Sequence, residues 1–73
     1  MVFTATIHGN LIGYATLADL SAAYERARDA SGEGASTFGS AKVFDSHGRQ
    51  IGRISYNGRV WDNADNIIFD NRT

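Results

Sequence analysis

The chain has 73 residues, a formal net charge of −1 and no cysteine, and 42% of its residues are hydrophobic while 21% are charged. This length supports one small domain, and the missing cysteine excludes a disulfide framework and any thiolate metal site. The charge lacks both the basic excess of a dedicated nucleic-acid binder and the acidic excess of a DNA mimic. We therefore expect residues 1–73 to form a single domain, with nucleic acid a less favoured partner than protein.

The sequence shows neither a membrane-spanning segment nor the pattern of a signal peptide, and both observations bear on the expected location. Its longest apolar runs are only a few residues, far shorter than the roughly 20 that span a bilayer. Its first residues do not place a basic segment before an apolar one, as a signal peptide would. We expect a cytoplasmic protein without membrane association. Because the core must be small, a protein partner or a second copy in a homodimer is expected to add stability.

The first predicted element is a strand over residues 2–8, where β-branched and apolar residues alternate before Gly9-Asn10 ends the run. Residues 11–15 either return as a short second strand across that turn or form a connector, and we favour the hairpin. The alternation places one set of apolar side chains on a common face: Phe3, Ala5 and Ile7.

A helix over residues 17–30 is predicted next. Thr16 suits the N-cap, and Asp19 completes a pattern that resembles a capping box. Gly32 stands where a C-terminal cap belongs. Apolar and small residues recur at spacings of three and four, which gives the helix one narrow buried stripe. The stripe consists of Leu17, Leu20, Tyr24, Ala27 and Ser31.

The second half of the chain predicts a meander of strands. Residues 31–40 form a Gly-rich connector, and strands follow over residues 41–45, 50–56 and 59–62. Residues 67–69 form an edge strand or a tail that docks on the sheet. The predicted fold class is α+β, with one amphipathic helix packed on an antiparallel sheet of four to five strands.

The dipeptides His47-Gly48 and Asn57-Gly58 predict the strand register, because each suits a two-residue turn. The resulting pairs are Ala41–Ile54, Val43–Gly52, Phe44–Ile51, Arg53–Asp62, Ile54–Trp61, Ser55–Val60 and Tyr56–Arg59. The predicted core face contains Ala41, Val43, Gly52, Ile54, Tyr56 and Trp61. The predicted second face contains Lys42, Phe44, Ile51, Arg53, Ser55 and Val60. A bulge at the His47 turn would exchange these faces.

The second face is more apolar than a solvated sheet face requires. Residues 67–69 cover it, or a partner or a second copy does. Arginine beside aromatic residues is typical of protein interfaces and of platforms that bind single-stranded nucleic acid. The opposing interpretation is a solvated face, on which Arg53 pairs with Asp62 and Arg59 stacks on Tyr56. The candidate partner-binding residues are Lys42, Phe44, Arg49, Ile51, Arg53 and Arg59.

No motif for catalysis or for a cofactor is apparent. Two histidines are too few for a typical catalytic zinc site, and Gly32-x-Gly34 follows a helix, the reverse of a phosphate-binding loop. Residues 62–66 are rich in oxygen ligands but lack the pattern of a calcium loop, so a turn is expected there. No serine has a basic partner in the sequence, and no carboxylates are paired by spacing. We expect a protein that is not an enzyme and needs no metal or cofactor.

Two segments carry a resemblance to known proteins. Residues 28–38 (RDASGEGASTF) and 52–61 (GRISYNGRVW) resemble small proteins of phages and prophages of proteobacteria. Some of these are similar to anti-CRISPR inhibitors of type I systems, the type I-C group being the nearest. The resemblance covers about half of the chain and implies a phage-encoded inhibitor that binds the Cascade surveillance complex and blocks target DNA binding. It assigns no binding residues.

A different function is the alternative to the inhibitor. The chain would then be a small accessory domain that binds nucleic acid or protein through an arginine and aromatic sheet face. That face would use Arg49, Arg53, Tyr56, Arg59 and Trp61.

Overall fold

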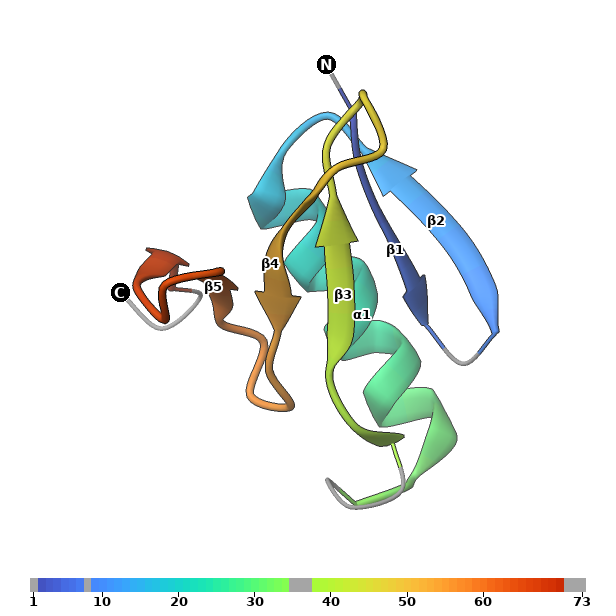
Figure 1. Cartoon of the computed structure of the whole chain (residues 1–73). Coiled ribbons are helices and arrows are strands. Elements are labelled where there is room, and N and C mark those ends of the chain that lie inside the picture. Colours follow the sequence, from blue (N-terminus) through green and yellow to red (C-terminus); the bar gives the residue numbers. More distant parts are fainter. Residues whose placement is uncertain (1, 8, 35–37, 71–73) are drawn as a thin grey trace.

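The computed structural model describes residues 2–7, 9–34 and 38–70, and in these residues six strands form one antiparallel sheet with a single helix (Figure 1). The elements are β1 (Phe3–Ile7), β2 (Asn10–Tyr14), α1 (Leu17–Ser31), β3 (Ala41–Phe44), β4 (Gln50–Ile54), β5 (Val60–Asp62) and β6 (Ile67–Phe69). The strand order is β2-β1-β3-β4-β5-β6. The predicted α+β class is confirmed. The sheet exceeds the predicted four to five strands because residues near both ends of the chain add edge strands.

The N-terminal hairpin, which we favoured over a connector, does form, and its turn lies one residue earlier than predicted. Ile7 pairs with Asn10, so Asn10 belongs to β2, and Gly9 takes the positive φ of +80° that the turn needs. His8, which was assigned to the first strand, lies outside the described residues. Ala5 and Ile7 are buried, as the alternation predicted.

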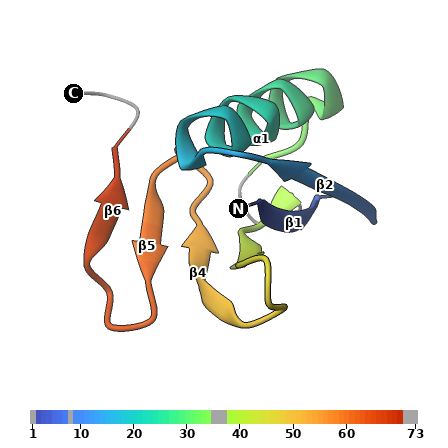
Figure 2. The same cartoon turned by 90° about the horizontal axis from the view of Figure 1, so that it is seen from above.

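The helix is held at both ends by the caps that the sequence predicted. The Thr16 hydroxyl accepts a hydrogen bond from the Asp19 backbone N–H at 3.1 Å. Gly32 adopts a left-handed conformation with φ +67°, and its N–H donates to the Arg28 carbonyl. Figure 2 shows α1 on one side of the sheet, with β2 and β6 at opposite edges. The opposite side of the sheet therefore carries no helix in the described residues.

Between α1 and the sheet lies a core of small and medium-sized apolar side chains. Val43, Ile54 and Val60, from three successive strands, are fully buried. Burial of a side chain of this size stabilises the folded state by about 1.5–3 kcal/mol. The buried cluster consists of Ala5, Ile7, Leu20, Tyr24, Ala41, Val43, Ile54 and Val60.

A three-residue turn joins β4 to β5, where the sequence predicted a two-residue turn. The Ser55 N–H donates to the Arg59 carbonyl at 2.9 Å, and the Gly58 N–H donates to the Ser55 carbonyl at 2.8 Å. Gly58 has φ +90°, as the last residue of a type I turn with a glycine bulge requires. The Asn57 carboxamide oxygen accepts from the Arg59 N–H at 3.2 Å, which caps the turn.

The turns that follow β3 and β5 have the same geometry. In each, an aspartate carboxylate accepts two backbone N–H groups, and the fourth residue has a positive φ: Gly48 at +80° and Asp65 at +65°. Asp45 and Asp62 are the aspartates, and each also closes its turn through backbone hydrogen bonds. The predicted two-residue turn at His47-Gly48 is therefore wrong, whereas the turn at residues 62–66 is confirmed.

The extra turn residue moves the register of β5 by one position relative to β4. Ile54 opposes Val60, Arg53 opposes Trp61, and Gly52 opposes Asp62. A shift of one residue turns every side chain of a strand to the other face. Val60 therefore lies in the core and Trp61 on the opposite face, the reverse of the prediction. The incorrect pairs are Tyr56–Arg59, Ser55–Val60, Ile54–Trp61 and Arg53–Asp62.

The register between β3 and β4 is mostly as predicted, because two irregularities compensate. The pairs Ala41–Ile54 and Val43–Gly52 are confirmed. The three-residue turn adds a residue, and the ladder then shifts between Val43 and Phe44, so that Phe44 opposes Gln50. The predicted Phe44–Ile51 pair is wrong.

The connector after α1 is attached to the rest of the molecule by aromatic contacts. The Phe38 ring packs edge-on against Tyr24 and Tyr56, with centroids 5.3 and 6.4 Å away. The Tyr56 hydroxyl donates to the Glu33 carbonyl at 2.8 Å. The described part of this connector is thus held against the β4–β5 turn; residues 35–37 lie outside the described residues. Within the part of the chain that the structure describes, no helix has the length and apolar surface needed to cross a membrane.

Gly52 gives a direct test of this packing. A Cβ atom at Gly52 would lie 1.8 Å from the Trp61 carbonyl oxygen, which is backbone and cannot move aside. We expect Gly52→Ala to lower the free energy of unfolding by about 3 kcal/mol or more. Urea denaturation measures the change. Gly34→Ala is the matched control, because nothing lies within 4 Å of its added Cβ. Equal stabilities of the two variants would contradict the structure.

The turn aspartates predict a loss of stability in acid. Hydrogen bonds from the Arg49 and His47 N–H groups lower the pKa of Asp45, and those from the Asn66 and Ala64 N–H groups lower that of Asp62. A lowered folded-state pKa stabilises the fold above the ordinary value of 3.8, and this stabilisation is lost as the pH falls through the folded-state value.

We expect the free energy of unfolding to decrease below roughly pH 4. It should decrease less in Asp45→Asn/Asp62→Asn, because an amide oxygen still accepts these hydrogen bonds but does not titrate. Denaturation at neutral and acidic pH compares the two proteins. An identical acid response would show that the turn carboxylates do not carry the effect.

Candidate partner-binding face

We call the side of the sheet opposite α1 the open face. Directly opposed residues of neighbouring strands share a face, so the register assigns its side chains. Lys42 opposes Arg53, Arg53 opposes Trp61, and Trp61 opposes Ile67. The open face carries Thr4, Thr6, Leu11, Lys42, Phe44, Arg53, Trp61 and Ile67.

One interpretation of the sequence expected residues 67–69 to cover the open face. They do not cover it. β6 pairs with β5 and extends the sheet as an edge strand. Ile67 and Ile68 remain 45% and 43% exposed there, and Leu11 on the opposite edge strand is 72% exposed. Apolar side chains therefore remain accessible at both edges.

Three of the six candidate site residues lie together on the open face. Lys42 is exposed, whereas Phe44 and Arg53 are half-buried in the centre of the sheet. Arg59 immediately precedes β5, and its guanidinium Nε lies 3.3 Å from the Asp70 carboxylate. It is therefore occupied near the β6 edge, away from the other three.

The remaining two candidates do not join this group. Arg49 lies at the β3–β4 turn, where its side chain is 77% exposed and pairs with Asp45 at 3.5 Å. Ile51 packs against the core cluster beside the β3–β4 irregularity. The structure thus brings Lys42, Phe44 and Arg53 together and places the other three candidates apart from them. Trp61, which is not among the six candidates, lies opposite Arg53 on the open face.

Trp61 is held in a fixed position on the open face. The Arg53 guanidinium carbon lies 5.4 Å from the centre of the indole ring, a cation–π distance. The Trp61 Nε1–H donates to the Ser55 hydroxyl at 3.1 Å. Arg53 also pairs with Asp65 at 2.8 Å. The predicted Arg53–Asp62 pair is wrong, since the Asp62 carboxylate caps its own turn.

The predicted stacking of Arg59 on Tyr56 is also wrong, because Arg28 takes that position. Its guanidinium carbon lies 5.4 Å from the Tyr56 ring centre, and its Nη1 donates to the Tyr56 carbonyl at 2.7 Å. Arg28 also forms an ion pair with Glu25, one turn earlier on the helix, at 3.9 Å. Arg28 therefore connects the helix to the β4–β5 turn and does not belong to the open face.

Lys42 carries the one positive charge of the open face that no described residue compensates. Arg53 and Arg59 have acidic partners, in Asp65 and Asp70. Lys42 forms no ion pair with any residue that the structure describes. The same residues include no cluster of three potential metal ligands. The face offers apolar, aromatic and cationic contacts, which is the chemistry of binding.

No family model, curated protein or solved structure matches the chain.

The reversed positions of Val60 and Trp61 can be tested by a matched pair of variants. Val60→Ser should lower the free energy of unfolding by about 3 kcal/mol, because a buried apolar side chain is lost and an unpaired hydroxyl is buried. Trp61→Ser should cost less, about 1 kcal/mol, because Trp61 lies on the open face. Urea denaturation ranks the two variants. The opposite order would support the two-residue turn and its register.

Proposed function

We propose that the protein is a stoichiometric inhibitor that binds another protein through the open face. The observation that carries this proposal is the position of Trp61, the single tryptophan of the chain, which lies outside the core, beside Arg53 and on the same face as Lys42 and Phe44. Tryptophan and arginine are the residues most enriched in the energetic centres of protein interfaces.

The contacts around Trp61 support this role because they reduce the cost of binding. Ordering a mobile side chain at an interface costs about 0.5–1.5 kcal/mol. Trp61 is already held by Ser55 and by Arg53, and Arg53 is held by Asp65. A partner would therefore meet a largely ordered aromatic surface.

For the target, we propose the Cascade surveillance complex of a type I CRISPR system, as the resemblance to phage anti-CRISPR proteins implies. The two segments that carry the resemblance, residues 28–38 and 52–61, pack against each other. Tyr56 from the second segment contacts Arg28 and Phe38 from the first. The resemblance thus falls on one packed unit, which supports a common fold as its origin. The inhibitor would act in the host cytoplasm without catalysis or cofactor.

Binding to Cascade is tested with the purified protein and a purified type I-C complex. We expect the two to co-elute in size-exclusion chromatography and the complex to lose binding of its target duplex. Lys42→Glu should weaken inhibition roughly fivefold to tenfold, because it reverses the uncompensated charge of the open face. Arg26→Glu is the matched control, since it reverses an exposed charge on α1. If the protein neither co-elutes with nor inhibits any type I complex, the proposed target is wrong.

A second candidate function is binding of single-stranded nucleic acid, favoured by the row Lys42, Arg53 and Trp61. Bases stack on aromatic rings beside cations, and such binding weakens strongly with salt. The ion pairs of Arg53 and Arg59 with carboxylates argue against it. Salt-sensitive binding of labelled oligonucleotides, weakened by Arg53→Ala, would support this function and contradict the inhibitor proposal.

A second copy of the chain is the remaining candidate to cover the open face. Light scattering of the purified protein distinguishes such a homodimer from a monomer.

A further inference from the structure

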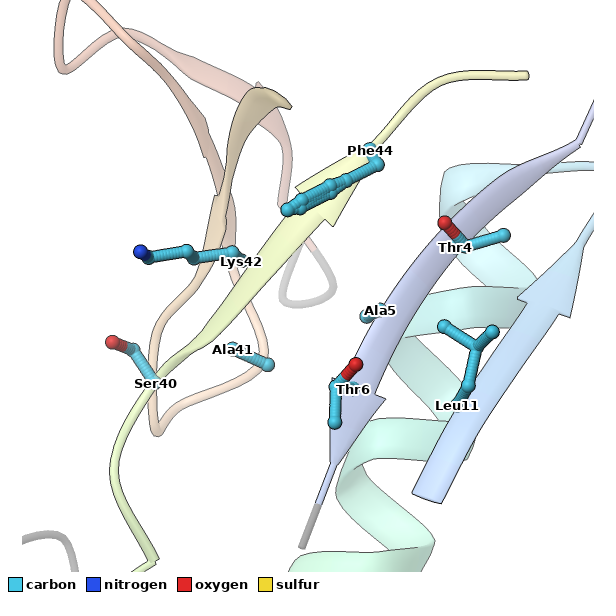
Figure 3. A pocket seen from close by; sticks show the side chains of 8 residues that line it. All are labelled: Thr4, Ala5, Thr6, Leu11, Ser40, Ala41, Lys42 and Phe44. Carbon is cyan, nitrogen blue, oxygen red and sulfur yellow. The ribbon is translucent and has the colours of Figure 1, made fainter. Parts of the chain in front are cut away.

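A hollow lies on the sheet between β1 and β3, where the two strands separate. They pair only at Thr4–Phe44 and Ala5–Val43, and Figure 1 shows them diverging beyond these positions. The hollow has a volume of about 340 Å³, at the small end of the range for ligand pockets. The residues that line it are Thr4, Ala5, Thr6, Leu11, Ser40, Ala41, Lys42 and Phe44 (Figure 3).

The lining combines small apolar groups with larger apolar walls. Ala5 and Ala41 border the gap on its two sides in Figure 3, and because their side chains belong to the core between α1 and the sheet, they place no large side chain in the hollow. Phe44 and Leu11 supply the larger apolar surfaces, and Leu11 is largely exposed. The hollow therefore suits one bulky apolar side chain, whose burial would also cover Leu11.

A positive charge stands at the rim of the hollow. Figure 3 shows the Lys42 side chain extending from β3 on the side away from β1, so its ammonium group stands beside the hollow and not inside it. Lys42 opposes Arg53, whose charge Asp65 balances, and Lys42 has no acidic partner among the described residues. Charge complementarity therefore favours a carboxylate next to the apolar group.

We propose that the hollow receives a bulky apolar side chain of the protein partner, with an adjacent carboxylate of the same segment at Lys42. This inference rests on the proposed function and adds the chemistry of the segment that the open face recognises. The apolar group supplies most of the affinity. Burial of a large side chain is worth at least tenfold in binding, whereas an exposed ion pair is worth about fivefold at most.

Capped dipeptides test the hollow without the partner. The probes are the N-acetyl amides of phenylalanyl-glutamate, of phenylalanyl-glutamine and of alanyl-glutamate. Each is titrated into the ¹⁵N-labelled full chain and followed by NMR. We expect saturable shifts at the amides of Thr6, Lys42 and Phe44 with the first probe. The glutamine probe should bind up to about fivefold more weakly, and the alanine probe at least tenfold more weakly.

Two variants separate the two parts of the site. Thr6→Phe places an aromatic ring into the hollow from an exposed strand position, and it should weaken the first probe at least tenfold. Lys42→Met keeps the aliphatic stem, and it should remove the preference for glutamate over glutamine. Arg26→Met, which removes an exposed charge from α1, should change neither. The dispersion of each variant's amide spectrum confirms that it is folded.

Shifts located elsewhere on the protein, or equal binding of the phenylalanine and alanine probes, would overturn the proposal. Unchanged binding to Thr6→Phe would do the same. The outcome for the hollow is distinct from that for the proposed function. If the chain inhibits Cascade and Thr6→Phe inhibits equally well, the hollow is excluded and the function stands. If the probes bind as expected but no Cascade complex is inhibited, the hollow stands and the target is excluded.

Discussion

The arrangement of the molecule depends on the backbone of the β4–β5 turn. With Gly58 in a left-handed conformation, Ser55 and Arg59 close a three-residue turn, and the register that follows from this turn places Val60 in the core. The same register brings the backbone of Trp61 against Gly52, where no side chain would fit. A turn shorter by one residue would direct an indole toward α1 in place of the fully buried Val60, and inserting so much larger a side chain into a packed core is destabilising.

The helix fixes this turn in space through polar contacts with its backbone. The Ser21 hydroxyl donates to the Gly58 carbonyl at 2.6 Å, and Arg28 donates to the Tyr56 carbonyl. Ser21 is itself buried, so the hydrogen bond also satisfies a hydroxyl that would otherwise cost roughly 1–3 kcal/mol. Because the turn is held from the helix side, its strands present Trp61 and Arg53 to the other side. Core packing and the candidate binding face are thus consequences of one contact region.

The sequence predicted the elements more reliably than their register, and the reason is physical. Thr16 and Gly32 cap α1 by contacts within one turn, so local chemistry was sufficient there. Asn-Gly suits a two-residue turn as well as a three-residue turn with glycine in the left-handed region, and packing decides between them. One sequence signal did exist. Asp or Ser stands three residues before the positive-φ residue in all three meander turns: Asp45 and Gly48, Ser55 and Gly58, Asp62 and Asp65. The ion-pair partners of Arg53 and Arg59 could not be predicted, because they depend on the register.

The third of these turns departs from the other two in a way that determines the charge of the open face. Asp65 occupies a position that glycine fills in the earlier turns, although a left-handed conformation costs a non-glycine residue about 1 kcal/mol. In return, the turn places a carboxylate 2.8 Å from Arg53. This pair is largely exposed and contributes little stability, so its main effect is electrostatic. It neutralises the cation that lies over Trp61 and leaves the positive charge of Lys42 unbalanced beside the hollow. The turn thereby leaves Lys42, nearer the centre of the sheet, as the cation that would meet a carboxylate of the proposed partner.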